Sequence, residues 1–204
     1  QGRKNFVYIS EGLPATAGLE LYEAIREKFQ DPSASMQEFE YDMNTKYVKI
    51  VQAANANGVT IYTLDASGLQ TADLVSAENR STGNQRGGDV HVNEFFVRQN
   101  MQGPIRMMAE ETGGIAAVNT NDWKASLDQI ASDFSNFYSL GYRSAKGASD
   151  RPHRIEVSVK KKGLKVRTRT SLVEKSVETK TAEAVLASLH YSRSDNPLRA
   201  SMSV

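Results

Sequence analysis

Four polar residues stand where two strand-like segments end, and their side chains have the chemistry of a binding site. Ser10 and Glu11 directly follow a short apolar run, and Asp65 and Ser67 follow a second run that is rich in β-branched residues. If the two runs form neighbouring parallel strands, their carboxyl ends meet at the sheet edge where ligands of open α/β proteins bind. The predicted ligand-binding residues are Ser10, Glu11, Asp65 and Ser67. The alternative is a pair of ordinary turns, which also favour Asp and Ser.

The same position allows a catalytic interpretation, because Ser10 lies between a strand and a turn as the nucleophile of many hydrolases does. The pattern Gly-x-Ser-x-Gly is not met, since Tyr8 stands in place of the first glycine. A Ser–His–acid triad would also need His153 or His190 to fold against Ser10. A hydrolase using Ser10 and Glu11 is therefore the weakest of three functional hypotheses. The sequence predicts no catalytic residue.

Metal binding through nitrogen or sulfur ligands has little support in the sequence. The chain has no cysteine, and its three histidines, His91, His153 and His190, are far apart. None of them shows the short His–His spacing of zinc sites. The only metal ligand predicted is Glu11, as part of an incomplete oxygen site.

The charge balance gives no electrostatic case for nucleic acid or an anionic membrane as a partner of the whole chain. The 25 basic and 24 acidic residues leave a formal charge of +1. Six cations do gather on one segment, at positions 160, 161, 162, 165, 167 and 169, but no aromatic residue interleaves with them. The favoured interpretation is a solvated strand face, and an acidic partner is the alternative. No stretch of about 18 apolar residues predicts a membrane span.

The first two thirds of the chain alternate between strand and helix patterns. Short apolar runs predict strands at residues 6–9, 59–64 and 115–118. Helical spacing of apolar residues predicts intervening helices, and Pro104 should break or kink one of them. A polar stretch at residues 79–89 predicts a mobile loop. This order predicts an α/β fold with an open parallel sheet and helices on both faces.

After residue 137 the apolar residues follow a period of two. Segments 137–142, 154–159 and 164–169 alternate, with a turn at 161–163, which predicts an antiparallel hairpin or meander. A short amphipathic helix, with Thr181 as its cap, should follow. The expected organisation is an α/β part at 1–143, a β-hairpin extension at 144–172, and a linker, a helix and the start of a further segment at 173–204.

Several of these segments, taken in order, resemble a known family. They are similar to the C-terminal half of a von Willebrand factor A-type (VWA) domain and to the β extension that follows it in the bacterial, Acidobacteria-type "VWFA-related" group. The segments that carry the resemblance are residues 2–12, 53–55, 59–69, 109–114, 137–142, 153–157 and 165–169. The resemblance implies a partial VWA, Rossmann-like sheet.

VWA domains usually bind Mg²⁺, and the resemblance places only one ligand position of that site in this chain. An Asp-x-Ser-x-Ser loop and a later Thr would precede residue 1 in the family pattern. The aspartate expected after the fourth strand is replaced by Glu11, whose extra methylene moves the carboxylate by roughly 1.5 Å. We therefore expect no cofactor in this chain. Mg²⁺ would bind only if a missing N-terminal half or a partner completed the site.

The family pattern also predicts what the chain does. The fourth VWA strand is normally central, so residues 6–9 would form an exposed apolar edge, which stable proteins avoid. We expect a protein partner, or the remainder of a longer chain, to cover it. The favoured function is a non-catalytic protein-binding or adhesion module of a bacterial envelope or secreted protein, located in the periplasm, at the cell surface or outside the cell. The alternative is an assembly subunit that packs through its sheet edge.

Overall fold

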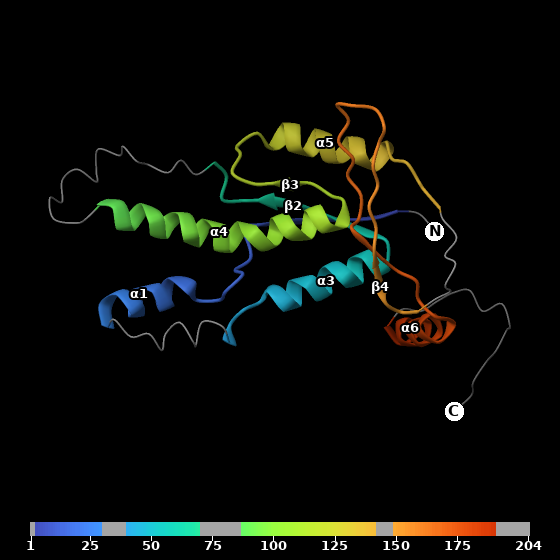
Figure 1. Cartoon of the computed structure of the whole chain (residues 1–204), viewed down its shortest axis with the longest axis horizontal. Helices are drawn as coiled ribbons and strands as arrows, with labels where there is room; N and C mark the ends of the chain where they lie inside the picture. Colours follow the sequence, from blue (N-terminus) through green and yellow to red (C-terminus); the bar gives the residue numbers. More distant parts are fainter. Residues whose placement is uncertain (1–2, 30–39, 70–86, 142–148, 191–204) are drawn as a thin grey trace.

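The computed structural model describes residues 3–29, 40–69, 87–141 and 149–190. Three parallel strands run side by side: β1 (Lys4–Ser10), β2 (Val59–Asp65) and β3 (Ala116–Ala117) (Figure 1). β2 is central and pairs with β1 along its whole length, from Lys4 opposite Val59 to Ser10 opposite Asp65. β3 pairs with the end of β2. The predicted open parallel sheet is confirmed.

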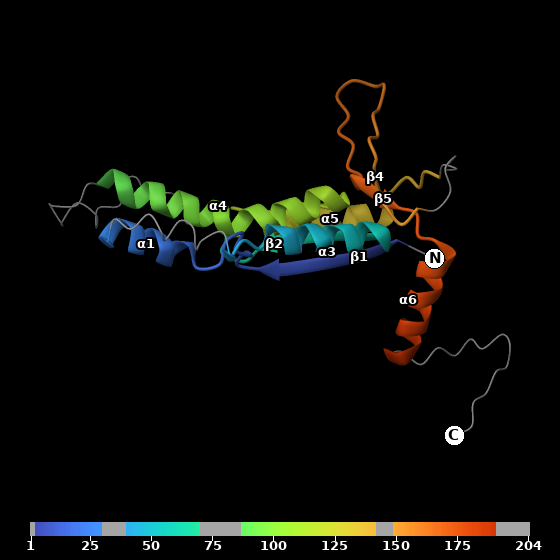
Figure 2. The ribbon, with the colours of Figure 1, turned by 60° about the horizontal axis from the view of Figure 1, so that its bottom comes forward.

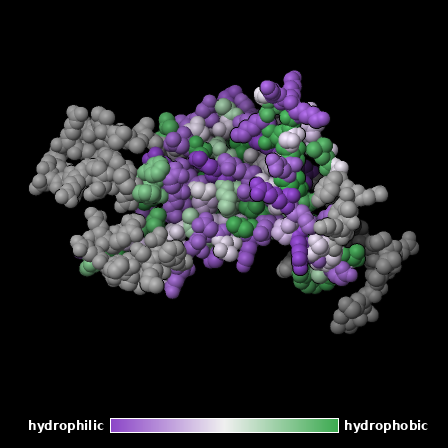
Figure 3. Space-filling view, in the orientation of Figure 1, coloured by the Kyte–Doolittle hydropathy of each residue, from purple (hydrophilic) through white to green (hydrophobic). Residues whose placement is uncertain are grey.

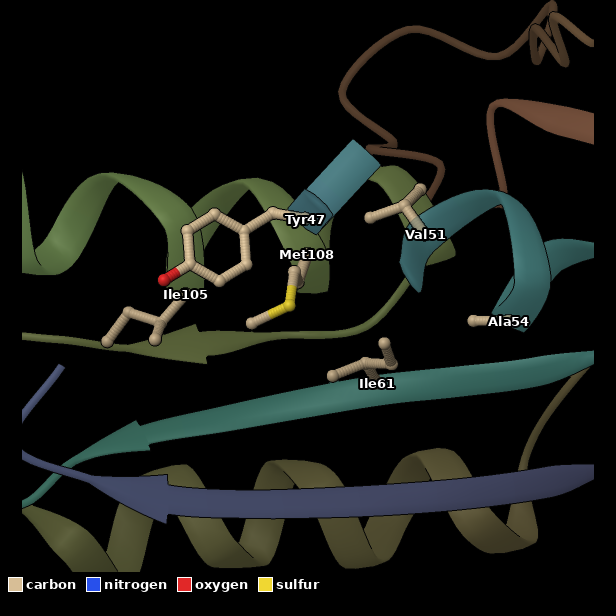
Figure 4. Packing of buried hydrophobic residues seen from close by; sticks show 6 residues of the cluster. All are labelled: Tyr47, Val51, Ala54, Ile61, Ile105 and Met108. Atoms are coloured by element: carbon tan, nitrogen blue, oxygen red, sulfur yellow. The ribbon is translucent and has the colours of Figure 1, made fainter. Parts of the chain in front are cut away.

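Helices cover both faces of this sheet, as the sequence predicts. On one face lie α3 (Asn44–Ala56) and α4 (Gly87–Thr112). Their apolar residues enclose Ile61 of β2 (Figure 4), and the labelled cluster comprises Tyr47, Val51, Ala54, Ile61, Ile105 and Met108. Because side chains of a strand alternate between faces, the next residue, Tyr62, points to the opposite side. There it packs with Leu64, Ala117 and Ile130 under α5 (Trp123–Ser135).

The ends of two predicted elements follow local backbone chemistry. α3 stops at Asn57-Gly58, with Gly58 in the left-handed region at φ +66° that glycine adopts at helix ends. α5 starts directly after Asp122, because the Asp122 side chain accepts a 2.9 Å hydrogen bond from the backbone N–H of Ala125. α1 (Leu19–Phe29) precedes α3 and lies beside the first half of α4 (Figures 1 and 2).

Of the two effects predicted for Pro104, a break or a kink, the break is wrong, because α4 continues through it. A proline has no N–H, so the carbonyl one turn earlier, at Asn100, loses its helical donor. The backbone N–H of Ala15 donates to that oxygen at 2.9 Å instead. The predicted loop at 79–89 is also corrected in part: α4 begins at Gly87, and residues 79–86 lie outside the described residues.

The predicted antiparallel hairpin is present, but the predicted strand positions at 154–159 and 164–169 are wrong, because the pairing lies at the base of the hairpin. β4 (Pro152–Arg154) pairs with β5 (Ser171–Val173), and residues 155–170 between them project from the body (Figure 2). The segment predicted as a strand at 137–142 contains none within its described part, 137–141.

The C-terminal helix α6 (Val177–His190) is confirmed, but its predicted cap is wrong. The Ser176 hydroxyl accepts a 3.1 Å hydrogen bond from the N–H of Thr179, so the helix begins earlier than Thr181. No described helix has both the length and the apolar character needed to cross a membrane.

Candidate functional site

The ends of β1 and β2 bring the predicted polar residues to one edge of the sheet. Ser10 and Asp65 are direct partners in the parallel register. The backbone N–H of Ala66 donates to the Ser10 carbonyl at 2.8 Å, which holds the two strand ends together. The sequence therefore placed these residues correctly relative to each other, at the carboxyl ends of neighbouring strands.

The Asp65 carboxylate is buried and occupied by the protein's own donors. Asp65 is only 1% exposed to solvent. One oxygen, Oδ1, accepts from the backbone N–H of Ser67 at 3.0 Å and from the Ser67 hydroxyl at 2.5 Å. The other, Oδ2, accepts from the Gln102 amide nitrogen at 2.7 Å. Because both oxygens already have charge-assisted bonds, Asp65 and Ser67 stabilise the turn after β2.

Ser10 and Glu11 differ from each other in accessibility. The Ser10 hydroxyl accepts a 3.2 Å hydrogen bond from the N–H of Gly12, so it also closes a local turn. Gly12 has φ +119°, and a Cβ there would lie 2.8 Å from the Met101 carbonyl oxygen. The turn thus needs glycine to approach α4. Glu11 is exposed and is the accessible carboxylate among the four predicted residues.

The ends of β1 and β2 offer few groups for metal binding or catalysis. No group of three or more His, Cys, Asp or Glu side chains that could hold a metal ion exists among the described residues. Ser10 and His153 have separate partners, since the His153 ring nitrogen lies 3.2 Å from the Ser149 hydroxyl. The ligand-binding assignment of the four strand-end residues stays a prediction, with Glu11 as its accessible member.

Gln102 is the member of this edge that the sequence reasoning missed. It lies in α4, buried on the same side as Ile105 and Ala109, three and seven residues further on. An amide on an otherwise apolar helical face needs a hydrogen-bond partner. The position of Gln102 on an apolar helical face was therefore a signal in the sequence that its amide has a buried partner. The sequence did not identify Asp65 as that partner.

A second polar cluster lies at the opposite end of the sheet and joins distant segments. The Arg3 guanidinium donates to the Tyr62 hydroxyl at 3.0 Å and to the Asp133 backbone carbonyl at 3.3 Å. Arg167 of the projecting segment donates to the Asp133 carboxylate at 2.6 Å. Burial raises the pKa of the Tyr62 phenol, and Arg3 acts against that rise. The cluster links β2, α5 and the hairpin.

The outer edge of β1 carries backbone groups that point away from the described sheet. In a parallel strand, the N–H and C=O of one residue point to one neighbour, and those of the next residue point away. Ser10 directs its carbonyl towards β2, and Tyr8 and Phe6 share its phase. Asn5, Val7 and Ile9 therefore turn their backbone groups outward. Within the described part of the chain, no strand pairs with this side of β1.

Several side chains of β1 are exposed to solvent, as its outward backbone groups are. Ile9 is 62% exposed, and Phe6 and Val7 are exposed as well. Phe6 lies on the face of Tyr8 and α4, whereas Val7 and Ile9 lie on the face of Tyr62 and α5. Apolar side chains on both faces are typical of a strand that is buried inside a sheet. β1 is thus an uncovered apolar edge of the described sheet, and its expected coverage by a partner or a longer chain stays a prediction.

Comparisons with known protein families, with curated proteins and with solved structures gave no significant match to this chain. The α/β arrangement, with three parallel strands between helices, is established by the structure itself.

Proposed function

We propose that this chain is a non-catalytic protein-binding module of the VWA type, and that it binds through the outer edge of β1. The observation behind the proposal is the unpaired outward backbone of Asn5, Val7 and Ile9 beside exposed apolar side chains. Free edge strands recruit extended polypeptides, because each outward N–H and C=O gains a hydrogen bond from an added strand. The bound segment would belong to a protein partner or to the remainder of a longer chain.

β1 has almost none of the features by which natural proteins keep an edge strand from pairing with another chain. Such edges usually carry proline, a bulge or charged side chains. β1 pairs with β2 without interruption over all seven residues and has one charged residue, Lys4, at its start. The apolar residues Val7 and Ile9 lie at its centre and end. An uninterrupted, apolar edge fits a surface that another polypeptide covers.

The resemblance to VWA domains implies where such a module would act. It implies an adhesion-type module of a bacterial envelope or secreted protein, in the periplasm, at the cell surface or outside the cell. It also implies that Mg²⁺ would bind only with ligands supplied from outside these residues, next to Glu11. The enzyme hypothesis gains no support from the strand-end geometry, because Asp65 and Ser10 are both engaged in turns.

An assembly role is the second candidate function, and one observation favours it. α6 stands apart from the sheet, and its apolar residues are exposed (Figure 2). Val185, Leu186 and Leu189 recur at helical spacing, so one stripe of the helix lacks a partner within the described residues. Two uncovered apolar surfaces on one chain would suit a subunit that is buried among others.

Self-association of the purified chain tests which surface recruits polypeptide. A second copy can pair with β1 by the same backbone groups as any other strand. We expect sedimentation velocity to show concentration-dependent association of the wild-type chain, and Ile9→Lys to abolish it. The control is Leu186→Lys, since Leu186 of α6 is 60% exposed and so matches Ile9.

The control should associate like the wild type. Association lost only in Leu186→Lys would favour the assembly role through α6. A wild-type chain that stays monomeric at all concentrations would contradict the proposal that β1 recruits polypeptide.

A further inference from the structure

The projecting hairpin segment, residues 155–170, is held only at its base. Arg167 bonds the Asp133 carboxylate at 2.6 Å, and Arg169 donates to the Asn55 carbonyl at 3.1 Å. Beyond these contacts the segment extends away from the sheet and its helices (Figure 2). Both arginines are thus used for anchoring, and the cations that remain at the far end are lysines.

Those lysines form a cluster of positive charge that no ion pair neutralises within the described residues, and we call this cluster the lysine tip. Its members are Lys160, Lys161, Lys162 and Lys165, together with the intervening Gly163 and Leu164. All four lysines are exposed, and none has a hydrogen bond or ion pair within the described residues. Glu156 is the one acidic residue of the whole segment. Gly163 turns with φ +84° and has open space around it.

Exposed apolar side chains accompany the lysine tip. Leu164 is 59% exposed within it, and Val159 is 47% exposed immediately before it. Hydrophilic residues gather at the projecting end, with hydrophobic ones directly next to them (Figure 3). The same small surface therefore offers four ammonium groups and two uncovered apolar side chains.

We propose that the lysine tip binds the surface of an anionic lipid bilayer. Lysine stems let the ammonium groups reach lipid phosphates while the neighbouring Val159 and Leu164 enter the interface. Single-stranded nucleic acid would call for aromatic stacking residues, and the segment has none. An acidic protein groove would favour the planar fork of arginine, but both arginines are bound at the base. A convex tip suits a flat target.

The size of the effect follows from the charge. Each lysine near an anionic membrane strengthens binding by a factor of about five. Four lysines together would increase the binding constant several-hundred-fold, which is on the order of the difference between undetectable and clearly measurable binding. Salt should weaken the interaction steeply, because the screening length falls from about 10 Å at 0.1 M to about 3 Å at 1 M.

Cosedimentation of the full chain with lipid vesicles tests the proposal. We expect binding to vesicles of phosphatidylcholine mixed with phosphatidylglycerol, and none to pure phosphatidylcholine. Replacing Lys160, Lys161, Lys162 and Lys165 with Gln should abolish binding. The matched control replaces four other exposed lysines, Lys46, Lys49, Lys124 and Lys180, with Gln. It changes the net charge equally, so it should bind within a factor of about two of the wild type.

Three results would overturn the proposal. The wild-type chain could fail to bind the anionic vesicles, or the two fourfold variants could bind alike, or the chain could bind soluble polyglutamate but not vesicles. The last result would assign the tip to an acidic protein. Leu164→Ser provides a variant with unchanged charge, which should bind several-fold more weakly if the apolar residues enter the interface. Circular dichroism of each variant confirms folding.

Discussion

The Gln102 side-chain amide donates a 2.7 Å hydrogen bond to the Asp65 carboxylate, which joins the middle of α4 to the end of the central strand β2. Both residues are buried. The bond explains why a carboxylate can lie inside the molecule beside the predicted binding edge, because its second oxygen would otherwise lack a donor. It also makes the stability of that edge depend on a residue 37 positions away in sequence.

Removing the amide should therefore destabilise the fold. Gln102→Ala leaves a buried carboxylate oxygen without its donor, which costs about 1–3 kcal/mol or more for a charged group. Urea unfolding measures the change. Gln99→Ala, an exposed position in the same helix, is the control and should change the unfolding free energy by less than about 0.5 kcal/mol. Equal effects of the two substitutions would contradict the structural role of Gln102.

Two glycines of the chain should respond to alanine to very different degrees. A Cβ at Gly114 would lie 1.8 Å from the Ile61 carbonyl oxygen, so Gly114→Ala must displace the strand that follows α4. We expect a loss of about 3 kcal/mol. Gly103 is exposed within α4, but Pro104 follows it, and the proline ring crowds a Cβ on the helical residue before it, which offsets the usual gain of alanine over glycine; Gly103→Ala should therefore change the unfolding free energy by less than about 1 kcal/mol. Thermal unfolding compares the two variants, and a Gly114→Ala protein as stable as the wild type would contradict the close packing.

Stability should fall at high pH because of the buried tyrosines. Burial and, secondarily, the nearby Tyr8 raise the pKa of the Tyr47 phenol above its usual 10.0. The unfolded chain then loses the phenol proton first, so the stability present below about pH 10 is lost as the pH rises through the folded-state pKa. Tyr47→Phe should make this loss smaller, and the remainder belongs partly to Tyr62, whose pKa is also raised. Urea unfolding between about pH 8 and about pH 11 measures it. An unchanged pH profile in Tyr47→Phe would exclude this contribution.

Magnesium should not stabilise the chain. A bound ion raises the unfolding free energy by RT ln(1 + [L]/Kd), so a functional site would increase the melting temperature as Mg²⁺ is added. Glu11 is exposed, and the Asp65 oxygens are bonded to Ser67 and Gln102. We therefore expect a constant melting temperature. A saturable increase that disappears in Glu11→Gln would show that these residues alone form a cation site.

The alternation of strands and helices was readable from the sequence because each element has a strong local pattern. β2 is a run of β-branched and aromatic residues, and α5 begins at an aspartate that caps it. The parallel direction that brings the ends of β1 and β2 to one edge of the sheet follows from that alternation, since a helical crossover returns the chain in the same direction.

What the sequence could not predict depends on contacts between distant segments. α4 continues through Pro104 because the N–H of Ala15, far away in sequence, satisfies the carbonyl that proline frees. The strands of the hairpin shorten to three residues each, and the arms beyond them project instead of extending the pairing. Gln102 was missed for the same reason, because its role depends on where Asp65 lies.

The central claim, that the outer edge of β1 is open to an added strand, is tested most directly by amide hydrogen exchange of the dilute chain. The amides of Tyr8 and Ser10 point towards β2 and should exchange slowly, whereas those of Val7 and Ile9 point outward and should exchange at least about tenfold faster. Equal protection of all four amides would contradict the account, because it would mean that the edge is already covered.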